Sequence, residues 1–102
     1  MTRIQISSDA LEDLDEGFSF YEYQESGLGA YFASELRSDI NGLTTTAGIH
    51  RQAYRSLHRL LSTRFPYSIY YKFSDDIALV VAVVDNRRDP SWIKQHLDET
   101  SP

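Results

Sequence analysis

The stretch from Arg64 to Pro90 constrains the fold more than any other part of the 102-residue chain. Its first part, Pro66–Phe73, is rich in aromatic and β-branched residues, which favour strands, and proline is tolerated where a strand starts. Ser74-Asp75-Asp76 then gives a turn signal. The next part, Ile77–Val84, is unbroken apolar sequence, too short to span a membrane and typical of a strand covered on both faces. The stretch therefore predicts a β-hairpin whose second strand is central in a sheet and ends at two arginines, Arg87-Arg88.

Hydrophobic periodicity places the remaining elements. Apolar residues recur at three- and four-residue spacing in two segments separated by Gly27-Leu28-Gly29, which predicts two antiparallel amphipathic helices. The stripe of the first helix is predicted to be Leu11, Leu14, Phe18 and Tyr21, and that of the second Phe32, Leu36, Ile40 and Leu43. The second of these helices is predicted to run from about Ala30 to Leu43. The other predicted elements are a strand at Thr2–Ser7, a loop at Thr44–Arg51, a strand at Tyr54–Leu61 and a last helix at Ser91–Leu97.

This order, β-α-α-β-β-β-α, predicts an α+β fold. A helical hairpin has to bury its apolar stripe, and one face of a sheet is the available surface. We therefore expect the hairpin to pack on a mostly antiparallel four-stranded sheet, with a short C-terminal helix that starts at Asp89-Pro90. The length and the lack of linkers or repeats predict a single domain over residues 1–102.

Composition narrows the class of protein and its compartment. The net charge is −5, distributed as −7 over residues 1–50 and +2 over residues 51–102, so direct nucleic-acid binding is not expected. The chain has no cysteine and no apolar stretch of signal-peptide or membrane-span length, which predicts a cytoplasmic protein without membrane contact. The three histidines lack the spacing of a helical metal site, so neither a metal nor another cofactor is expected.

The candidate site is the cationic end of the hairpin. Arg64, Arg87 and Arg88 are joined there by residues of the preceding strand, Arg55, His58 and Arg59. Guanidinium groups bind phosphate or carboxylate with two parallel hydrogen bonds. The alternative is that these arginines pair with nearby carboxylates on a solvated face, which is the common fate of surface charges. His58 near the arginines is a candidate general base, against the simpler interpretation of a half-exposed strand histidine.

Two aromatic residues complete the candidate site. In the strand at Pro66–Phe73, Tyr70 shares a face with Ser68 and Lys72, opposite the other aromatic residues, and could stack on a base or a partner. Trp92, in the last helix, either holds that helix on the sheet or anchors an interface.

The pattern F-P-Y-x-I-x-Y, a short turn, an apolar strand and R-R-D-P resembles the RelE/ParE toxins of bacterial toxin–antitoxin pairs. The resemblance is strongest over Leu57–Trp92 and implies the same fold. It also implies one of two activities. RelE-like members cleave messenger RNA on the ribosome, whereas ParE-like members poison DNA gyrase. Both are silenced by an antitoxin whose disordered tail folds onto the toxin.

Departures from the RelE-like pattern decide between the branches. Those nucleases commonly carry an arginine where this chain has Ser68, and many members carry histidine at Asp85. Arg87 matches an arginine of the pattern, while Trp92 and His96 lie near a catalytic position without matching it. Losing one donor to a developing phosphorane charge typically costs about 10²–10³ in rate.

The resemblance therefore predicts a toxin closer to the ParE-like or plasmid stabilisation members, with gyrase as the target and a cognate antitoxin as partner. The predicted target- or antitoxin-binding residues are Arg64, Tyr70, Arg87, Arg88 and Trp92. The alternatives are a RelE-like endoribonuclease using Arg87, Arg64 and His58, and a non-toxic interaction domain of the same fold.

Overall fold

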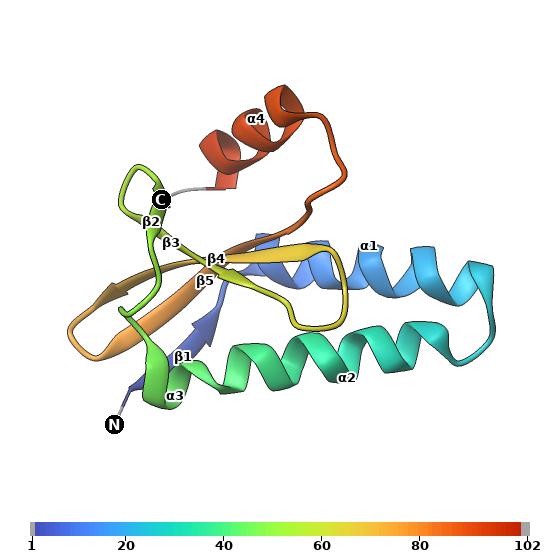
Figure 1. Ribbon diagram of the computed structural model, residues 1–102, viewed down its shortest axis with the longest axis horizontal. Coiled ribbons are helices and arrows are strands. Elements are labelled where there is room, and N and C mark those ends of the chain that lie inside the picture. Colours follow the sequence, from blue (N-terminus) through green and yellow to red (C-terminus); the bar gives the residue numbers. More distant parts are fainter. Residues whose placement is uncertain (1, 101–102) are drawn as a thin grey trace.

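The computed structural model describes residues 2–100 and contains four helices and five strands in that range. The strands form one sheet in the order β1-β5-β4-β3-β2, in which β1 runs parallel to β5 and all other neighbours are antiparallel (Figure 1). The elements are β1 (Arg3–Ile6), α1 (Ser8–Gln24), α2 (Leu28–Asn41), α3 (Leu43–Thr46), β2 (Gln52–Tyr54), β3 (Leu57–Leu61), β4 (Tyr67–Ser74), β5 (Ile77–Asp85) and α4 (Pro90–Thr100).

The predicted α+β class is confirmed, with differences in the segment between α2 and β4. The sheet has five strands instead of four, because the segment predicted as one strand, Tyr54–Leu61, is divided between β2 and β3. The division falls at Arg55, whose φ of 53° places it in the left-handed region and turns the chain back on itself. The predicted loop at Thr44–Arg51 begins inside a short helix, α3. The strand predicted as central, β5, is interior, between β1 and β4.

The helical hairpin of α1 and α2 lies side by side on one face of the sheet, as expected (Figure 1). The predicted stripe of α2 is confirmed, since Phe32, Leu36 and Ile40 are buried. The predicted stripe of α1 is wrong at Leu11 and Phe18, which are 44% and 38% exposed.

The small residues Ala10 and Gly17 of α1 face the core instead of Leu11 and Phe18, because the two helices approach closely. A Cβ on Gly17 would lie 2.5 Å from a ring carbon of Phe32, and a Cβ on Gly29 would lie 2.6 Å from the Phe18 carbonyl oxygen. The buried positions of α1 are therefore Ala10, Asp13, Leu14, Gly17 and Tyr21.

Two apolar clusters cover the two faces of the sheet. The larger one joins the helical hairpin to Ile69, Tyr71 and Val80, and the smaller one lies between the sheet and α4. Leu97 of α4 is 1% exposed in the smaller cluster. The start of α4 agrees with the prediction, because Asp89 Oδ1 accepts hydrogen bonds from the backbone N–H and the hydroxyl of Ser91.

A β-bulge in β5 decides which side chains reach α1. Tyr70 pairs with Ala82 but Tyr71 pairs with Val80, so Val81 is an extra residue in β5. Val80 faces the helical hairpin, and simple alternation would put residues 82 and 84 on that face. The bulge shifts the alternation, so that Val83 joins the hairpin cluster instead. Asp85, two residues further on, is thereby directed to the same side.

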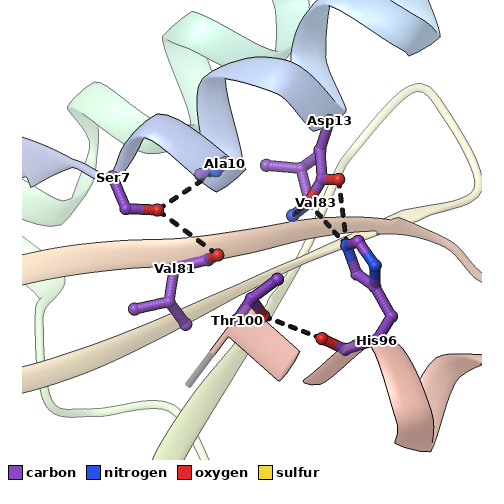
Figure 2. Close-up of polar contacts among 7 residues, drawn as sticks. All are labelled: Ser7, Ala10, Asp13, Val81, Val83, His96 and Thr100. Atoms are coloured by element: carbon purple, nitrogen blue, oxygen red, sulfur yellow. Dashed lines mark hydrogen bonds and ion pairs between the residues drawn. The ribbon is translucent and has the colours of Figure 1, made fainter. Parts of the chain in front are cut away.

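The second half of β5 also lacks a neighbouring strand on the side of β1, which ends at Ile6. Side chains near the start of α1 bond to this edge instead (Figure 2). Ser7 Oγ donates to the Val81 carbonyl oxygen at 3.4 Å, and Asp13 Oδ2 accepts from the Val83 N–H at 2.9 Å. The helix thus takes over the hydrogen bonding of the sheet where the strand has stopped.

Candidate functional site

Arg87 is fixed beyond the end of β5 by three hydrogen bonds to Asp85. The backbone N–H donates to Asp85 Oδ1 at 2.9 Å, Nε donates to Oδ1 at 3.0 Å, and Nη2 donates to Oδ2 at 2.9 Å. Nη2 also donates to the Tyr21 hydroxyl at 3.2 Å, and the guanidinium lies 6.0 Å from the centre of the Phe20 ring. The side chain stays 55% exposed, so Arg87 is at once held in place and accessible.

The pKa values of this pair agree with a lasting ion pair. Burial pushes the pKa of Asp85 upwards, but the hydrogen bonds and charge of Arg87 outweigh it and hold this pKa below its usual value. The hydrogen bond to Asp85 in turn raises the pKa of Arg87. On β4 beside them, burial raises the pKa of Tyr67 to about 12, with the Asp85 charge adding to the shift. Arg87 is therefore a positive group whose charge is balanced at its own site.

Arg88 points to a different neighbour. Its guanidinium lies 4.0 Å from the centre of the Trp92 ring, a cation–π distance. Trp92 stacks in turn on His96, one helical turn further along α4, with ring centres 4.8 Å apart and planes 9° from parallel. No ion pair of Arg88 is found within residues 2–100, so its charge is less balanced than that of Arg87.

Asp13 links this stack to the sheet. His96 Nε2 lies 2.9 and 3.1 Å from the two oxygens of Asp13, which also accepts the Val83 N–H (Figure 2). Asp13 is 8% exposed, and desolvation raises its pKa against the opposing hydrogen bonds from Val83 and His96. A buried carboxylate thus ties α1, β5 and α4 together at one point.

A cavity of about 220 Å³ lies between α1, the end of β5 and the start of α4. Its walls include Asp13, Glu16, Phe20, Asp85, Arg88 and Trp92. The predicted residues Arg88 and Trp92 therefore meet around one hollow, next to the fixed Arg87.

On the α4 face of the sheet, Arg59 of β3 bonds to Ser68 of the neighbouring strand β4. Arg59 Nε donates to Ser68 Oγ at 2.8 Å, and the Ser68 hydroxyl donates to Asn86 Oδ1 at 2.6 Å. Ser68 itself is fully buried. The neighbouring strand β3 thus places a guanidinium beside the Ser68 hydroxyl.

The other predicted site residues contact partners other than Asp85 and Tyr21. Arg64 contacts Glu35 of α2 at 3.5 Å, and Arg55 pairs with Asp98 of α4 at 3.2 Å. Tyr70 is 7% exposed in the cluster beneath α4, so its ring is not accessible to a partner while α4 is docked.

His58 lies beside Tyr71, in another part of the sheet. It pairs with Tyr71, whose partner in β5 is Val80, five residues before Asp85. Its ring stacks on Tyr71 with centres 5.0 Å apart, and Nδ1 lies 2.7 Å from the His50 carbonyl oxygen. Within residues 2–100, no three His, Cys, Asp or Glu residues gather in a way that could hold a metal ion.

Sequence reasoning missed Asp13, Phe20, Tyr21 and His96. A signal for Asp13 was present, because it lies three residues after Ala10 and four before Gly17, on the small-residue face of α1. That face becomes visible as the core face only once the close approach of α2 is known. His96 was noted by its place in the chain, but its contact with α1 spans 83 residues and has no local signal.

Comparisons with known proteins agree with this fold. The family model described as ParE toxin of type II toxin-antitoxin system, parDE, matches residues 4–90. A solved structure titled as the chromosomal ParDE TA system from P. aeruginosa superposes with a TM-score of 0.77 at 13% sequence identity, covering 83% of this chain and 96% of that one.

A second solved structure, the isolated E. coli RelE toxin, gives a TM-score of 0.62 at 12% identity, covering 93% of this chain and 95% of that one. At such identities these two similarities show the fold alone. No curated protein sequence matches the chain. No helix in residues 2–100 is long and apolar enough to cross a membrane. The match over residues 4–90 identifies this chain as a member of the ParE toxin family of type II toxin–antitoxin systems.

Proposed function

We propose that this toxin inhibits growth by binding DNA gyrase in the cytoplasm, and that a cognate antitoxin neutralises it by covering the same surface. The observation that carries the proposal is the Arg87–Asp85 pair. Two hydrogen bonds of 2.9 and 3.0 Å fix the guanidinium, while 55% of the side chain stays exposed. A rigid, accessible arginine next to exposed aromatic area is typical of the residues that dominate protein interfaces.

The same pair argues against a catalytic role for Arg87. Cleavage of RNA by 2′-hydroxyl attack needs positive groups whose charge can balance that of the developing phosphorane. The carboxylate of Asp85 already balances Arg87. We therefore infer that Arg87 makes directional hydrogen bonds to a protein target.

Arg88 and Trp92 extend the binding surface on the α4 side. Their cation–π contact orders both side chains at the mouth of the cavity, so they can enter an interface with little further loss of conformational freedom. Arg64 lies at the α2 side with its side chain 66% exposed and extends the surface in that direction. Tyr70 contributes from beneath α4, by supporting the helix that carries Trp92.

The test is expression of the chain alone in bacteria, with growth, a reporter of DNA damage and purified-gyrase supercoiling followed together. We expect growth arrest, a DNA-damage response and loss of supercoiling. Arg87→Ala should weaken gyrase binding about 30-fold, the usual loss at a dominant interface arginine, while the protein still folds. The matched control is Arg37→Ala, because Arg37 is exposed on α2 and should leave toxicity unchanged.

Full toxicity of Arg87→Ala would remove Arg87 from the target-binding surface. Growth arrest with intact DNA would refute gyrase as the target. No arrest at all, given soluble folded protein, would favour an interaction domain that is not toxic.

A second candidate, a ribosome-dependent endoribonuclease, rests on Arg59. Its guanidinium lies 2.8 Å from the Ser68 hydroxyl and could replace the arginine that nucleases of this fold carry on β4. Messenger RNA cleavage in a translating extract, abolished by Arg59→Ala but not by Arg37→Ala, would establish this activity. We expect no cleavage.

A further inference from the structure

The C-terminal helix α4 has little apolar packing at the end that carries Trp92. Among residues 90–100 of α4, only Leu97 is buried, at 1% exposed. Trp92 and Ile93, near the start of the helix, are half-buried against the same cluster. Apolar packing therefore anchors α4 close to its C-terminal end, and other contacts are needed to fix the turn of Trp92.

Polar contacts hold α4 from two sides. Towards β2, Asp98 accepts a hydrogen bond from the Tyr54 hydroxyl and pairs with Arg55 at 3.2 Å. Towards α1, His96 Nε2 lies 2.9 and 3.1 Å from the two oxygens of Asp13 (Figure 2). His96 and Asp98 are two positions apart, which places their side chains on nearly opposite sides of a helix. The two contacts together therefore set the rotation of α4 about its own axis.

The buried charge of Asp13 is explained by its contact with α4. Asp13 is 8% exposed, and desolvation raises its pKa, so burial of the carboxylate is costly. The Val83 N–H, 2.9 Å from Oδ2, needs a single acceptor, which an uncharged amide oxygen could supply. The contact with His96 involves both carboxylate oxygens. An ionised carboxylate has two acceptor oxygens, whereas an amide has one, so the contact with His96 accounts for the charge at this position.

Ring stacking extends this contact to the surface of the protein. His96 and Trp92 are four residues apart and lie on the same face of α4. Their ring centres are 4.8 Å apart and their planes are 9° from parallel. The guanidinium of Arg88 lies 4.0 Å from the centre of the Trp92 ring. The four side chains thus form a continuous series of contacts from the buried Asp13 to the exposed Arg88.

Arg87 is supported by other residues. Asp85 and Tyr21 hold its guanidinium from β5 and α1. The target-binding surface therefore has two separately supported parts, and the part formed by Arg88 and Trp92 is the one in contact with the Asp13–His96 pair.

We propose that Asp13 and His96 are positioning residues of this toxin: through the stacked ring of Trp92, they hold Trp92 and Arg88 in the orientation in which these two side chains bind gyrase. The inference rests on the proposed function, in which Arg88 and Trp92 contact the target. Asp13 and His96 need not touch gyrase themselves, because Asp13 is 8% exposed and the His96 side chain is 22% exposed. Side chains that are ordered before binding lose less conformational entropy at the interface, which raises the affinity.

The first measurement is the fluorescence of the toxin alone, because Trp92 is the single tryptophan of the chain. An imidazole ring stacked on an indole quenches its emission and shields one face of it from acrylamide. His96→Ala and Asp13→Ala should both raise the emission and the quenching by acrylamide, since each releases the Trp92 ring. The control is Asp15→Ala, which removes an exposed carboxylate of the same helix and should change neither. Wild-type emission and quenching in folded Asp13→Ala would overturn the role of Asp13.

The second measurement is the affinity of purified variants for gyrase, with folding checked by circular dichroism. His96→Ala leaves Asp13 in place to accept the Val83 N–H, so it tests positioning even if Asp13→Ala does not fold. We expect His96→Ala to raise Kd about fivefold, in the range of couplings between contacting residues. When Arg88→Ala and Trp92→Ala are already present, adding His96→Ala should change Kd less than about twofold, because no side chain is left to be positioned.

Arg64→Ala provides the matched background, since Arg64 contacts Glu35 of α2 at the other side of the surface. In that background His96→Ala should again raise Kd about fivefold. A loss of equal size in the two backgrounds would mean that His96 acts on the fold as a whole, and it would overturn the inference.

The outcomes separate this inference from the proposed function. If the wild-type toxin binds no gyrase, the proposed function fails and the inference fails with it. If the wild type binds and His96→Ala binds equally tightly, only the positioning role is overturned.

Discussion

Asp13→Ala tests whether α1 completes the hydrogen bonding of β5. Asp13 is the acceptor for the buried Val83 N–H at 2.9 Å and the partner of His96 at 2.9 Å. Alanine supplies no acceptor for either donor, and only water from the 220 Å³ cavity that Asp13 and Val83 line could replace the carboxylate. Both donors are therefore left without their partner when Asp13 is replaced.

The magnitude follows from these two donors. A buried N–H without an acceptor costs about 1–3 kcal/mol, and a hydrogen bond to a charged group contributes about 1.5–3 kcal/mol. Part of this is offset, because the raised pKa of Asp13 shows that burial disfavours its charged form. The net loss should be about 2–4 kcal/mol, out of a total of about 5–15 kcal/mol for a domain. At about 4 °C per kcal/mol for a chain of this size, Tm should fall by roughly 8–16 °C.

The assay is urea unfolding at pH 7, followed by circular dichroism. The pH matters because a raised folded-state pKa favours the folded state at low pH, and this advantage disappears as the pH rises through that pKa. Asp13→Asn should lose less stability than Asp13→Ala, because the amide oxygen can still accept the Val83 N–H. Asp15→Ala is the matched control, since Asp15 is exposed and the change should stay within about 0.5 kcal/mol.

Equal stability of Asp13→Ala and Asp15→Ala would refute this reasoning. A double-mutant cycle with His96→Ala isolates the contact between α1 and α4, and we expect a coupling of about 0.5–3 kcal/mol. No coupling would mean that α4 is held by its apolar contacts alone.

Three further predictions concern the sheet and the helical hairpin. Val81→Asp should unfold the protein, because Val81 is 1% exposed and a buried unpaired charge is costly; Ile49→Asp, at a residue 76% exposed, should stay folded by the same circular dichroism measurement. Gly17→Val should lower Tm by several degrees, because a Cβ there lies 2.5 Å from a ring carbon of α2; an unchanged Tm would contradict the close approach of the helices. The lowered folded-state pKa of Asp85 contributes stability above about pH 4 that is lost as the pH falls through that pKa, so Asp85→Asn should lose less stability on acidification than wild type. This difference should be at most about 1 kcal/mol, since Arg87 is 55% exposed, and identical acid profiles would count against the pair.

Local sequence was sufficient for most of the elements. The alternation in β4 and the stripe of α2 each have a period that only one regular structure can bury. The apolar run of β5 has no such period, but its short length, its β-branched residues and the turn signals around it indicate a strand. The signals that mark the ends of elements were also local, namely the Asp89 cap of α4 and the turn at Asp75-Asp76. The resemblance carried by the motif over Leu57–Trp92 led to the family that the match over residues 4–90 shows.

Contacts between distant segments decided the rest. The stripe of α1 was mispredicted because the approach of α2 selects Gly17 for the core over the larger Phe18. The extra strand β2 depends on a left-handed residue, Arg55, which has no strong propensity for that conformation.

Tertiary structure also decided which residues come together at the candidate site. The sequence by itself determined that positive charge follows β5 and that α1 is acidic, since both are properties of contiguous residues. Only the folded chain decided which charges meet. The bulge at Val81 directs Asp85 to the α1 side, where Tyr21 joins it in holding Arg87. The fold gives Arg59, Arg64 and His58 other partners, which are Ser68, Glu35 and Tyr71. The physical reason is that a one-residue shift in register reverses the facing of every later side chain in a strand, and no local sequence signal specifies where such a shift occurs.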